Sequence, residues 1–300
     1  MNNLIDGFVI DCKTMGYSCR TIESYTGHVK YYLDRYSIKS QVEVDDLQPF
    51  LMHLRDERNL TFSTINAYFA SLSTFFDYLE HIGILQKHEI GKFRKRYLRR
   101  YKKRHTPQQK QLISIDKMRE LIESADSLEH LTLMIFLAKT GIRRNELITL
   151  DRSDISLVSN TVLLKPTPKR SNRLVYFDDE CKAFLKAYLD TRKDKNPALF
   201  LSTTGDRISR NMVYKIVIEY AQKLGIHKPK GHVHEKFTPH CFRVWFTTHL
   251  RRSGMSKSFI QELRGDVRGE AIDIYDHIEC DELKTAYMRH IPQLGIVPKF

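Results

Sequence analysis

The sequence predicts a mostly α-helical protein with a small β-sheet, built as two domains. Three observations support this fold class. Apolar residues recur at helical spacing through the first 85 residues, a long basic run follows them, and a second series of amphipathic helices accompanies a single predicted hairpin. The 300 residues are enough to bury one large core or two modest ones. We therefore expect domains at residues 1–88 and 111–300, joined by a linker at 89–110.

Four helices joined by short turns are expected in the first domain. The first covers residues 3–14, and Ser18 is the expected N-cap of the second. The acidic pair Asp45–Asp46 introduces the third helix. Ser63 is predicted to cap the fourth, which ends at Gly83.

The linker holds the run KFRKRYLRRYKKR at residues 92–104, with nine basic side chains and no acidic one. Such runs are often solvated and disordered. Here the run lies between two folded segments and is interleaved with Phe93, Tyr97 and Tyr101, so we interpret it as a strap that neutralises backbone phosphates. The side chains predicted to do so are Lys92, Arg94, Lys95, Arg96, Arg99, Arg100, Lys102, Lys103 and Arg104.

The second domain is predicted to be helical around one hairpin. Ser114 or Asp116 caps its first helix, and the apolar helix LEHLTLMIFLAKT ends at Gly141. The segments TVLLK and RLVYF flank a polar turn and predict the hairpin. Four further amphipathic helices are expected at CKAFLKAYLDTRK, MVYKIVIEYAQKLG, HCFRVWFTTHLRRSG and SKSFIQELRG.

The charge balance indicates an anionic partner. The 49 Lys and Arg residues exceed the 36 Asp and Glu residues by 13, which favours nucleic acid over a membrane surface. No apolar run could span a bilayer, the first residues do not resemble a signal peptide, and the five scattered cysteines suggest a reducing cytoplasm. The usual ATP, dinucleotide, zinc and calcium motifs are absent, so we expect no cofactor and no metal.

Two short motifs combine residue types that bind phosphate. Thr238 and Pro239 predict a helix start, which places His240 and Arg243 on one face of the first turn, where free N–H groups and the helix dipole favour an anion. The pair His249–Arg252 has the same spacing but lies deep in that helix.

The second motif is TGIRRNEL, in which Arg143 follows a helix-ending glycine and Glu146 comes three residues later. It predicts either an ordinary capped corner with a salt bridge or an arginine held rigidly toward a phosphate. Tyr275 is one of 15 tyrosines and would ordinarily be a packing residue. As a nucleophile it would need neighbouring cations to lower the pKa of its phenol.

The order of these motifs resembles the tyrosine recombinase family, which is phage-integrase-like and includes the Xer-type resolvases. TGIRRNEL is followed by a basic hairpin, then TPHCFR, then LRGD nine residues before Tyr275. The segments TIESY and STINAYFASLSTFFDYL resemble the family's core-binding domain. The resemblance implies a four-helix, SAM-like core-binding domain and an α+β tyrosine recombinase catalytic domain, forming a clamp around duplex DNA.

The resemblance also implies roles for individual residues. Arg143 and the pair His240 and Arg243 match the family's phosphate-binding residues, with Glu146 as a structural acid, and Tyr275 matches the nucleophile. The hairpin lysine matches Lys169, with Lys165 as the alternative.

One position departs from the family. Where relatives usually carry LGH, this chain has LRGD, so Asp266 replaces a histidine. An ionised aspartate cannot donate a hydrogen bond to a phosphate and would repel it. It could instead orient Arg243 or Lys169, accept the proton of the nucleophile, be protonated in the closed site, or cap a nearby helix.

The resemblance implies a site-specific DNA recombinase or integrase that cuts and rejoins double-stranded DNA through a 3′-phosphotyrosine. The resemblance further implies a homotetramer on paired specific sites, and it allows accessory DNA-bending or directionality factors as further partners. It also implies a cytoplasmic, nucleoid-associated protein of prokaryotic, viral or plasmid origin. The C-terminal tail would dock either on its own domain or on a neighbouring subunit. Two other readings remain open: a type IB topoisomerase-like relaxing enzyme and a non-catalytic DNA-binding regulator of the same fold.

Overall fold

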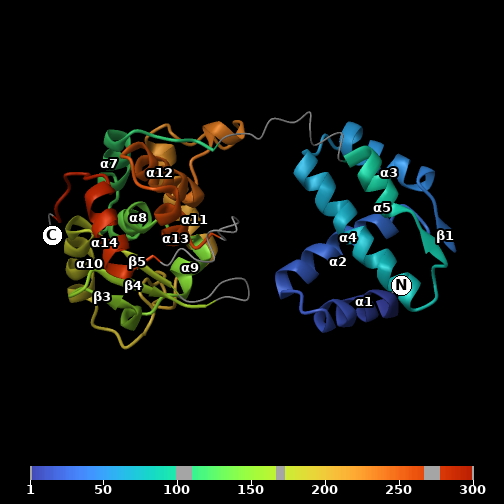
Figure 1. Ribbon diagram of the computed structural model, residues 1–300, viewed down its shortest axis with the longest axis horizontal. Coiled ribbons are helices and arrows are strands. Elements are labelled where there is room, and N and C mark those ends of the chain that lie inside the picture. The colour runs from blue at the N-terminus through green and yellow to red at the C-terminus, as the bar shows by residue number, and fades with distance from the viewer. Residues whose placement is uncertain (1, 99–109, 167–172, 267–277, 299–300) are drawn as a thin grey trace. The chain divides into compact units, whose positions relative to one another are not determined.

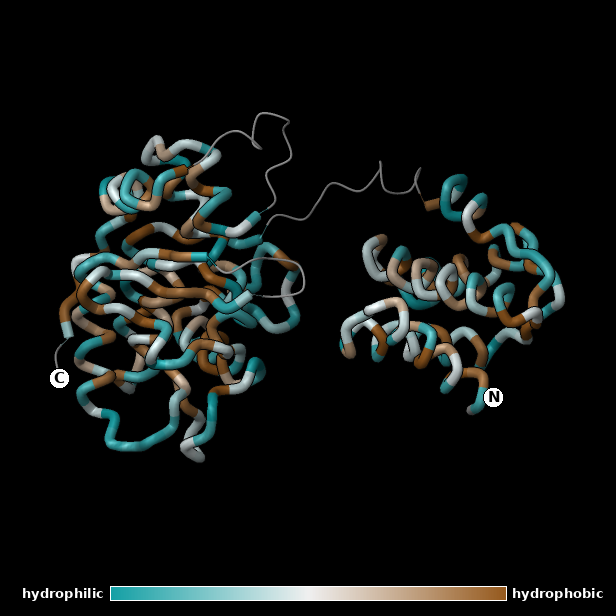
Figure 2. Tube along the Cα trace, turned by 60° about the horizontal axis from the view of Figure 1, so that its bottom comes forward, coloured by the Kyte–Doolittle hydropathy of each residue, from teal (hydrophilic) through white to brown (hydrophobic). Residues whose placement is uncertain are grey.

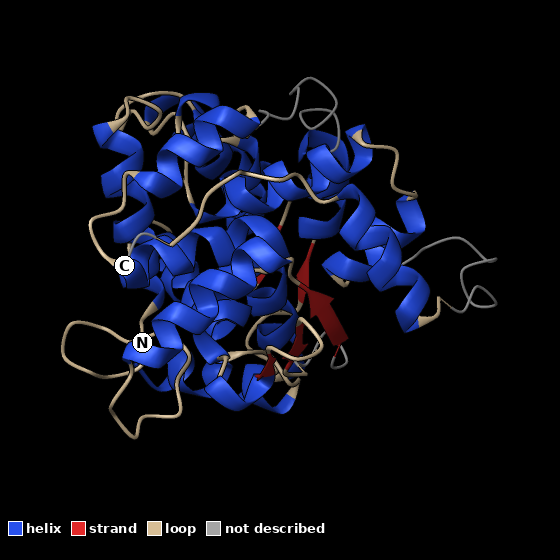
Figure 3. Ribbon diagram, turned by 90° about the vertical axis from the view of Figure 1, so that its left-hand side faces the viewer, coloured by secondary structure: helices blue, strands red, loops and turns tan. Residues whose placement is uncertain are grey.

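The computed structural model describes residues 2–98, 110–166, 173–266 and 278–298. The chain divides into two compact units, Met1–Pro107 and Gln108–Phe300, each with its own hydrophobic core (Figure 1). Helices dominate and the strands are few and short (Figure 3), which confirms the predicted fold class. None of the helices in the described ranges is long and apolar enough to cross a membrane.

The first unit is a small helical domain. Its α-helices are α1 (Asn2–Thr14), α2 (Cys19–Leu33), α3 (Gln48–Met52), α4 (Phe62–His81) and α5 (Ile90–Phe93). Short helices η1 (Asp45–Leu47), η2 (His53–Glu57) and η3 (Arg94–Leu98) adjoin them, and β1 (Gln41–Val42) pairs in parallel with β2 (Lys87–His88). The helix α4 is central, because it packs on α1, α2 and α5.

Side-chain caps begin the two longest helices of this unit, α2 and α4. Ser18 accepts a hydrogen bond from the backbone N–H of Thr21 at 3.2 Å, as predicted for α2. The prediction that Ser63 caps α4 was wrong. Thr61 has the extended backbone that a cap requires and accepts from the N–H of Thr64, whereas Ser63 already lies inside the helix.

The basic run begins as part of the first unit rather than as a linker. We expected the linker to start at residue 89, but residues 90–98 form α5 and η3. Phe93 and Leu98 are buried in the first core, and the Phe93 ring stacks on Phe69 with centroids 4.9 Å apart. Phe93 and Leu98 therefore face inward, whereas Lys92, Lys95 and Arg96 are exposed.

The second unit surrounds one buried helix. Its α-helices are α7 (Ile115–Glu123), α8 (Leu128–Thr140), α9 (Arg144–Thr149), α10 (Asp179–Thr191), α11 (Arg210–Lys223), α12 (Pro239–Arg252), α13 (Lys257–Arg264) and α14 (Cys280–His290). Two short 3₁₀ helices, η4 (Arg152–Asp154) and η5 (Val233–Glu235), complete the helical elements. The helix α8 is buried from residue 131 onward and packs on α10 and α12 (Figure 1).

The predicted hairpin is present. β4 (Thr161–Leu164) and β5 (Arg173–Tyr176) pair antiparallel, with Val162 opposite Val175, and β3 (Ile155–Ser156) adds a third strand. Hydrophobic and hydrophilic residues alternate along the elements of each unit (Figure 2), as one-sided burial requires. Ser114, rather than Asp116, caps α7 by accepting from the N–H of Lys117.

The described part of the C-terminal tail packs on its own domain. Lys139 is fully buried in α8 and donates to Asp178, Glu180 and the carbonyl of Pro292. Glu180 also accepts backbone N–H groups of residues 294–296. These contacts hold residues 292–296 against α8 and α10 of the same domain.

Candidate active site

The corner after α8 places Arg143. Gly141 ends α8 in the left-handed conformation at φ +58°, and a Cβ there would lie 2.4 Å from the Phe246 ring of α12. Two residues later the backbone N–H of Arg143 donates to Glu146 at 2.7 Å, which fixes the start of α9. The sequence requires a glycine at this corner both for its backbone angle and for close helix packing.

The first turn of α12 carries His240 and Arg243, as predicted. Pro239 is the first helical residue, and Thr238 precedes it in extended conformation. The Arg243 side chain is 3% exposed and donates to the carbonyls of Gly141 at 2.9 Å and Arg264 at 2.7 Å. Burial, with Arg143 and Arg264 nearby, lowers the pKa of Arg243 to about 9, which still leaves it charged at neutral pH.

Asp266 contacts three arginines: Arg143 just before α9, Arg243 on α12 and Arg264 at the end of α13. Its carboxylate accepts from Arg143 at 2.8 Å and from Arg243 at 3.2 Å, and it forms an ion pair with Arg264 at 2.8 Å. Burial acts to raise the pKa of Asp266, but the Arg264, Arg243 and Arg143 charges outweigh it and hold the pKa below its ordinary value. Asp266 is therefore an ionised acceptor that draws the Arg143 and Arg243 guanidinium groups together.

Arg173 is a residue that the sequence analysis missed. As the first residue of β5 it makes a bidentate pair with Glu146, both contacts at 3.1 Å, and it donates to the carbonyl of Leu263. Glu146 also receives the Arg143 guanidinium at 3.3 Å. Gly265 leaves room for this pair, because a Cβ there would lie 2.7 Å from the Arg173 guanidinium. The basic character of the hairpin could have pointed to Arg173, but no sequence pattern around Arg173 indicates that it pairs with Glu146.

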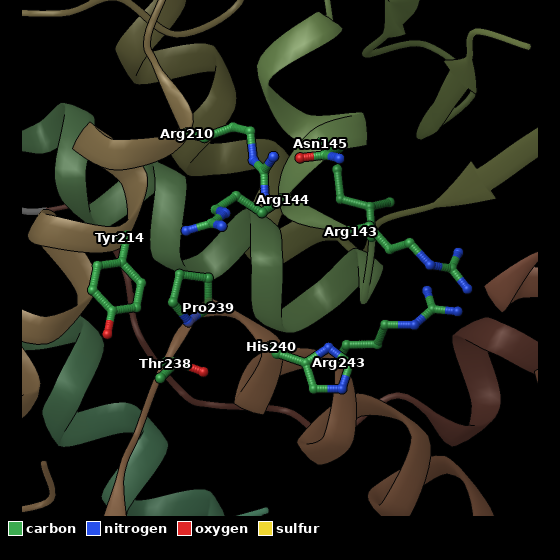
Figure 4. A pocket seen from close by; sticks show the side chains of 10 residues that line it. Arg143, Arg144, Asn145, Arg210, Tyr214, Thr238, Pro239, His240 and Arg243 are labelled. Carbon is green, nitrogen blue, oxygen red and sulfur yellow. The ribbon is translucent and has the colours of Figure 1, made fainter. Parts of the chain in front are cut away.

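The corner after α8 and the first turn of α12 border a pocket of about 310 Å³ (Figure 4). Arg143, His240 and Arg243 line it, and Figure 4 places the His240 ring beside the Arg243 side chain. Partial burial and then the charges of Lys110, Arg243, Arg264 and Arg143 lower the pKa of His240, so the ring is neutral at pH 7. A neutral imidazole among several cations can accept or donate one proton at an anion bound there.

Lys165, the alternative hairpin lysine, is not among the residues that line the pocket. Lys165 pairs with Asp151 at 2.5 Å and Asp154 at 3.4 Å, and the hydrogen bond with Asp151 is the main cause that raises its pKa. Lys169, Tyr275 and the basic residues Arg99, Arg100, Lys102, Lys103 and Arg104 lie outside the described residues.

The basic side chains of α5 and η3 gather in the first unit. Lys92, Lys95 and Arg96 line a hollow of about 550 Å³ beside Tyr97. Arg94 belongs to the same segment and is half-buried. Within the described ranges, no group of three or more His, Cys, Asp or Glu side chains is arranged to hold a metal ion.

Comparison with known proteins identifies the family. Residues 106–282 match the family model described as "Phage integrase family", and residues 4–84 match "Phage integrase, N-terminal SAM-like domain". The chain belongs to the phage integrase family. This membership confirms the predicted resemblance to tyrosine recombinases and the expectation of a tyrosine recombinase enzyme.

Individual proteins match this chain over most of their own length. The chain is 26% identical to "Tyrosine recombinase XerD" of Listeria monocytogenes serotype 4b (strain F2365), over 98% of this chain and 100% of that protein. The Tn1549 transposon integrase in complex with transposon right end DNA aligns over 95% of this chain and 98% of its own, with a TM-score of 0.70 and 16% identity. A lambda integrase tetramer bound to a Holliday junction aligns over 93% of this chain and 80% of its own, also with a TM-score of 0.70 and 16% identity. Both structures support the fold.

Proposed function

We propose that this phage integrase family member is a site-specific DNA recombinase that cuts and rejoins duplex DNA through a 3′-phosphotyrosine. The observation that carries the proposal is the convergence of Arg143 and Arg243 on Asp266, with His240 in the same pocket. Two guanidinium groups held in fixed positions match the two non-bridging oxygens of a phosphodiester.

In the proposed reaction, the phenolic oxygen of Tyr275 forms a bond to phosphorus while the bond from phosphorus to the 5′-oxygen breaks. The phenol proton passes to a base near the site, and the leaving 5′-oxygen takes a proton from Lys169. Arg143 and Arg243 stabilise the charge that develops on the phosphoryl oxygens, and His240 assists the proton transfer or donates a hydrogen bond to the phosphate. The phosphotyrosine conserves the energy of the phosphodiester, so the reaction requires no ATP. The fixed guanidinium groups of Arg143 and Arg243 supply the electrostatic stabilisation that a metal ion would otherwise provide, so the proposed reaction needs no metal ion.

The surroundings of Lys165 favour Lys169 as the general acid. Lys165 forms ion pairs with Asp151 and Asp154, and a raised pKa makes an ammonium group a weaker proton donor. In the sequence Lys169 stands between β4 and β5, and the bidentate pair of Arg173 with Glu146 anchors the start of β5 to the site.

Relatives also support the expected partners. The lambda integrase tetramer is bound to a Holliday junction, and the Tn1549 integrase is bound to transposon end DNA. We extend this to the present chain as a homotetramer on two DNA sites that exchanges strands, located in the cytoplasm with the nucleoid. Accessory DNA-bending or directionality factors belong to the same proposal.

Covalent trapping tests the function. A duplex that the protein binds is first selected from a random-sequence library, and the point at which the protein cleaves it is mapped. The duplex is then nicked beside that point, so that the leaving fragment diffuses away and the adduct accumulates. The wild-type protein should give an SDS-resistant protein–DNA adduct, and Tyr275→Phe should bind the duplex equally well without forming one. An adduct of wild-type yield from Tyr275→Phe would remove Tyr275 from the site. Relaxation of supercoiled DNA without crossover between two such sites would instead favour the topoisomerase reading, and binding without any adduct would favour the regulator.

A further inference from the structure

The pocket extends beyond the residues used in the proposed reaction. At the end away from the Arg143 and Arg243 guanidinium groups it is lined by Arg144, Arg210 and Tyr214 (Figure 4). Arg144 begins α9 and Arg210 begins α11, so both side chains project from the rigid first turns of helices.

The two ends of the pocket differ in their charge balance. Arg143 and Arg243 both contact Asp266, and Glu146 adds a second carboxylate. Among the described residues, no carboxylate lies within ion-pairing distance of Arg144 or Arg210. The Nε atom of Arg210 is buried and has no hydrogen-bond partner in the described part of the chain. A buried N–H donor without an acceptor is costly, and the Arg210 side chain lines the pocket, where an anion can accept from its guanidinium group.

Tyr214 holds Arg144 in an orientation suited to an anion. The Arg144 guanidinium lies 5.6 Å from the centroid of the Tyr214 ring. Packing against an aromatic ring limits the freedom of the side chain while its N–H edge remains able to donate. The Tyr214 side chain is itself accessible, since the residue is 40% exposed.

The size of the pocket exceeds the need of one phosphate. About 310 Å³ corresponds to roughly ten water molecules at about 30 Å³ each. Successive phosphates of one strand are about 3.4 Å apart along the duplex axis, so a strand that places one phosphate at Arg143 and Arg243 brings its neighbour close to the same pocket.

We propose that Arg144 and Arg210 form a second anion subsite that binds the backbone phosphate next to the scissile one on the cleaved strand. This inference rests on the proposed function. The subsite fixes the position of the strand relative to the Arg143–Arg243 pair, and it acts on the phosphate group rather than on the identity of a base.

The experiment measures the DNA affinity of protein variants on duplexes in which one backbone phosphate at a time is replaced by an uncharged methylphosphonate. Arg144→Gln/Arg210→Gln is compared with the parent in a Tyr275→Phe background, using the selected duplex with one methylphosphonate at a time on either side of the scissile position. The double variant should lose about tenfold in affinity or more, and the slope of log K against log salt should fall by about 0.9, as for one lost phosphate. At one flanking position the methylphosphonate should weaken the parent but not the double variant.

Controls separate charge, hydrogen bonding and folding. Arg251→Gln/Arg252→Gln changes two exposed arginines at the far end of α12 and should leave both affinity and slope unchanged. Arg144→Lys/Arg210→Lys keeps the charge and should retain the salt slope while losing part of the affinity, because lysine lacks the planar fork. Thermal unfolding of each variant shows whether the fold is intact.

Three outcomes would overturn the subsite. In the first, the losses of affinity caused by the double variant and by the methylphosphonate simply add at every flanking position. In the second, the effect of the double variant depends on a base substitution rather than on a phosphate, and in the third, calorimetry shows inorganic phosphate bound at Arg144 and Arg210 although neither residue affects DNA binding. Adduct formation through Tyr275 is measured in parallel. If the adduct forms normally while the effects are additive, only the subsite is rejected. If the wild-type protein, with Tyr275 intact, forms no adduct, the proposed recombinase function and the subsite fail together.

Discussion

Asp266 stands where the family resemblance predicts a histidine, and its contacts assign it a different role. In this structure it contacts the two guanidinium groups that the proposed reaction needs for the phosphate. A phosphodiester entering the site must share or replace these contacts, because carboxylate and phosphate carry the same sign of charge. The same contacts hold both arginines in place before DNA arrives. Asp266 therefore opposes binding while it prepares the site for cleavage.

Substitution of Asp266 should separate these two effects. Asp266→Asn keeps the shape but loses the charge, so we expect tighter DNA binding together with cleavage slowed about 10²-fold, the usual range for a positioning or proton-transfer group. Asp266→His should retain substantial cleavage if the site accepts the larger ring. Affinity by titration and single-turnover adduct formation provide the two readouts. Wild-type rates in Asp266→Asn would assign this residue to structure alone.

The His240 ring should gain a proton when DNA binds. Its pKa is lowered in the free protein from the ordinary value of 6.5 by partial burial and by neighbouring cations. A bound phosphate favours the charged imidazolium and raises that pKa again. Affinity should therefore increase as the pH falls from 8 toward 6, with net proton uptake. NMR titration of the ring, assigned with His240→Gln, and calorimetry in two buffers check this; an unchanged pKa in the complex would place His240 away from the phosphate.

Arg173 connects β5 of the hairpin to Glu146 in the first turn of α9. Arg173→Lys cannot reproduce the bidentate pair with Glu146, a buried contact whose loss should cost about 3 kcal/mol of unfolding free energy. Cleavage should fall about 10²-fold even where the protein is fully folded, because Arg143 and β5 shift relative to each other. Gly265→Ala should mimic the defect, since its Cβ would strike the same guanidinium. Single-turnover cleavage at a temperature well below unfolding separates the two effects, and normal cleavage by a folded Arg173→Lys would limit Arg173 to stability.

At the scale of elements, local signals predicted well and distant pairings did not. Gly141, Pro239 and the hairpin could be read from the sequence because each depends on neighbouring residues. The cap at Thr61 was missed because two hydroxyl residues stand two positions apart, and only the backbone angles distinguish them. The Arg173–Glu146 pair depends on how β5 packs beside α9 and α13, which no local pattern encodes.

The helical part of the basic run should bind phosphates from one face. Lys92, Lys95 and Arg96 gather around one hollow, while Phe93 and Leu98 are buried on the other side. Replacing these three cations with Gln should lower the slope of log K against log salt by up to about 2.7, at 0.9 for each phosphate contact. The loss should be similar for specific and unrelated duplexes, because phosphate contacts carry no base information. Salt titrations measure the slope, and an unchanged slope would show these side chains to be solvated.

At the scale of the whole molecule, two separate cores predict two separate unfolding events. The first core draws its buried residues from 5–98 and the second from 113–296, with no residue in common. The fragment 108–300 should therefore fold alone and melt at the temperature of one of two transitions of the full chain. It keeps Arg143, His240, Arg243 and Asp266 but lacks the basic residues of α5 and η3, so it should still form the Tyr275 adduct, only at much higher DNA concentration. Differential scanning calorimetry and adduct titration test both parts. A single cooperative transition of the full chain, or a fragment that cuts at wild-type DNA concentrations, would show that the two units do not divide folding and DNA affinity in this way.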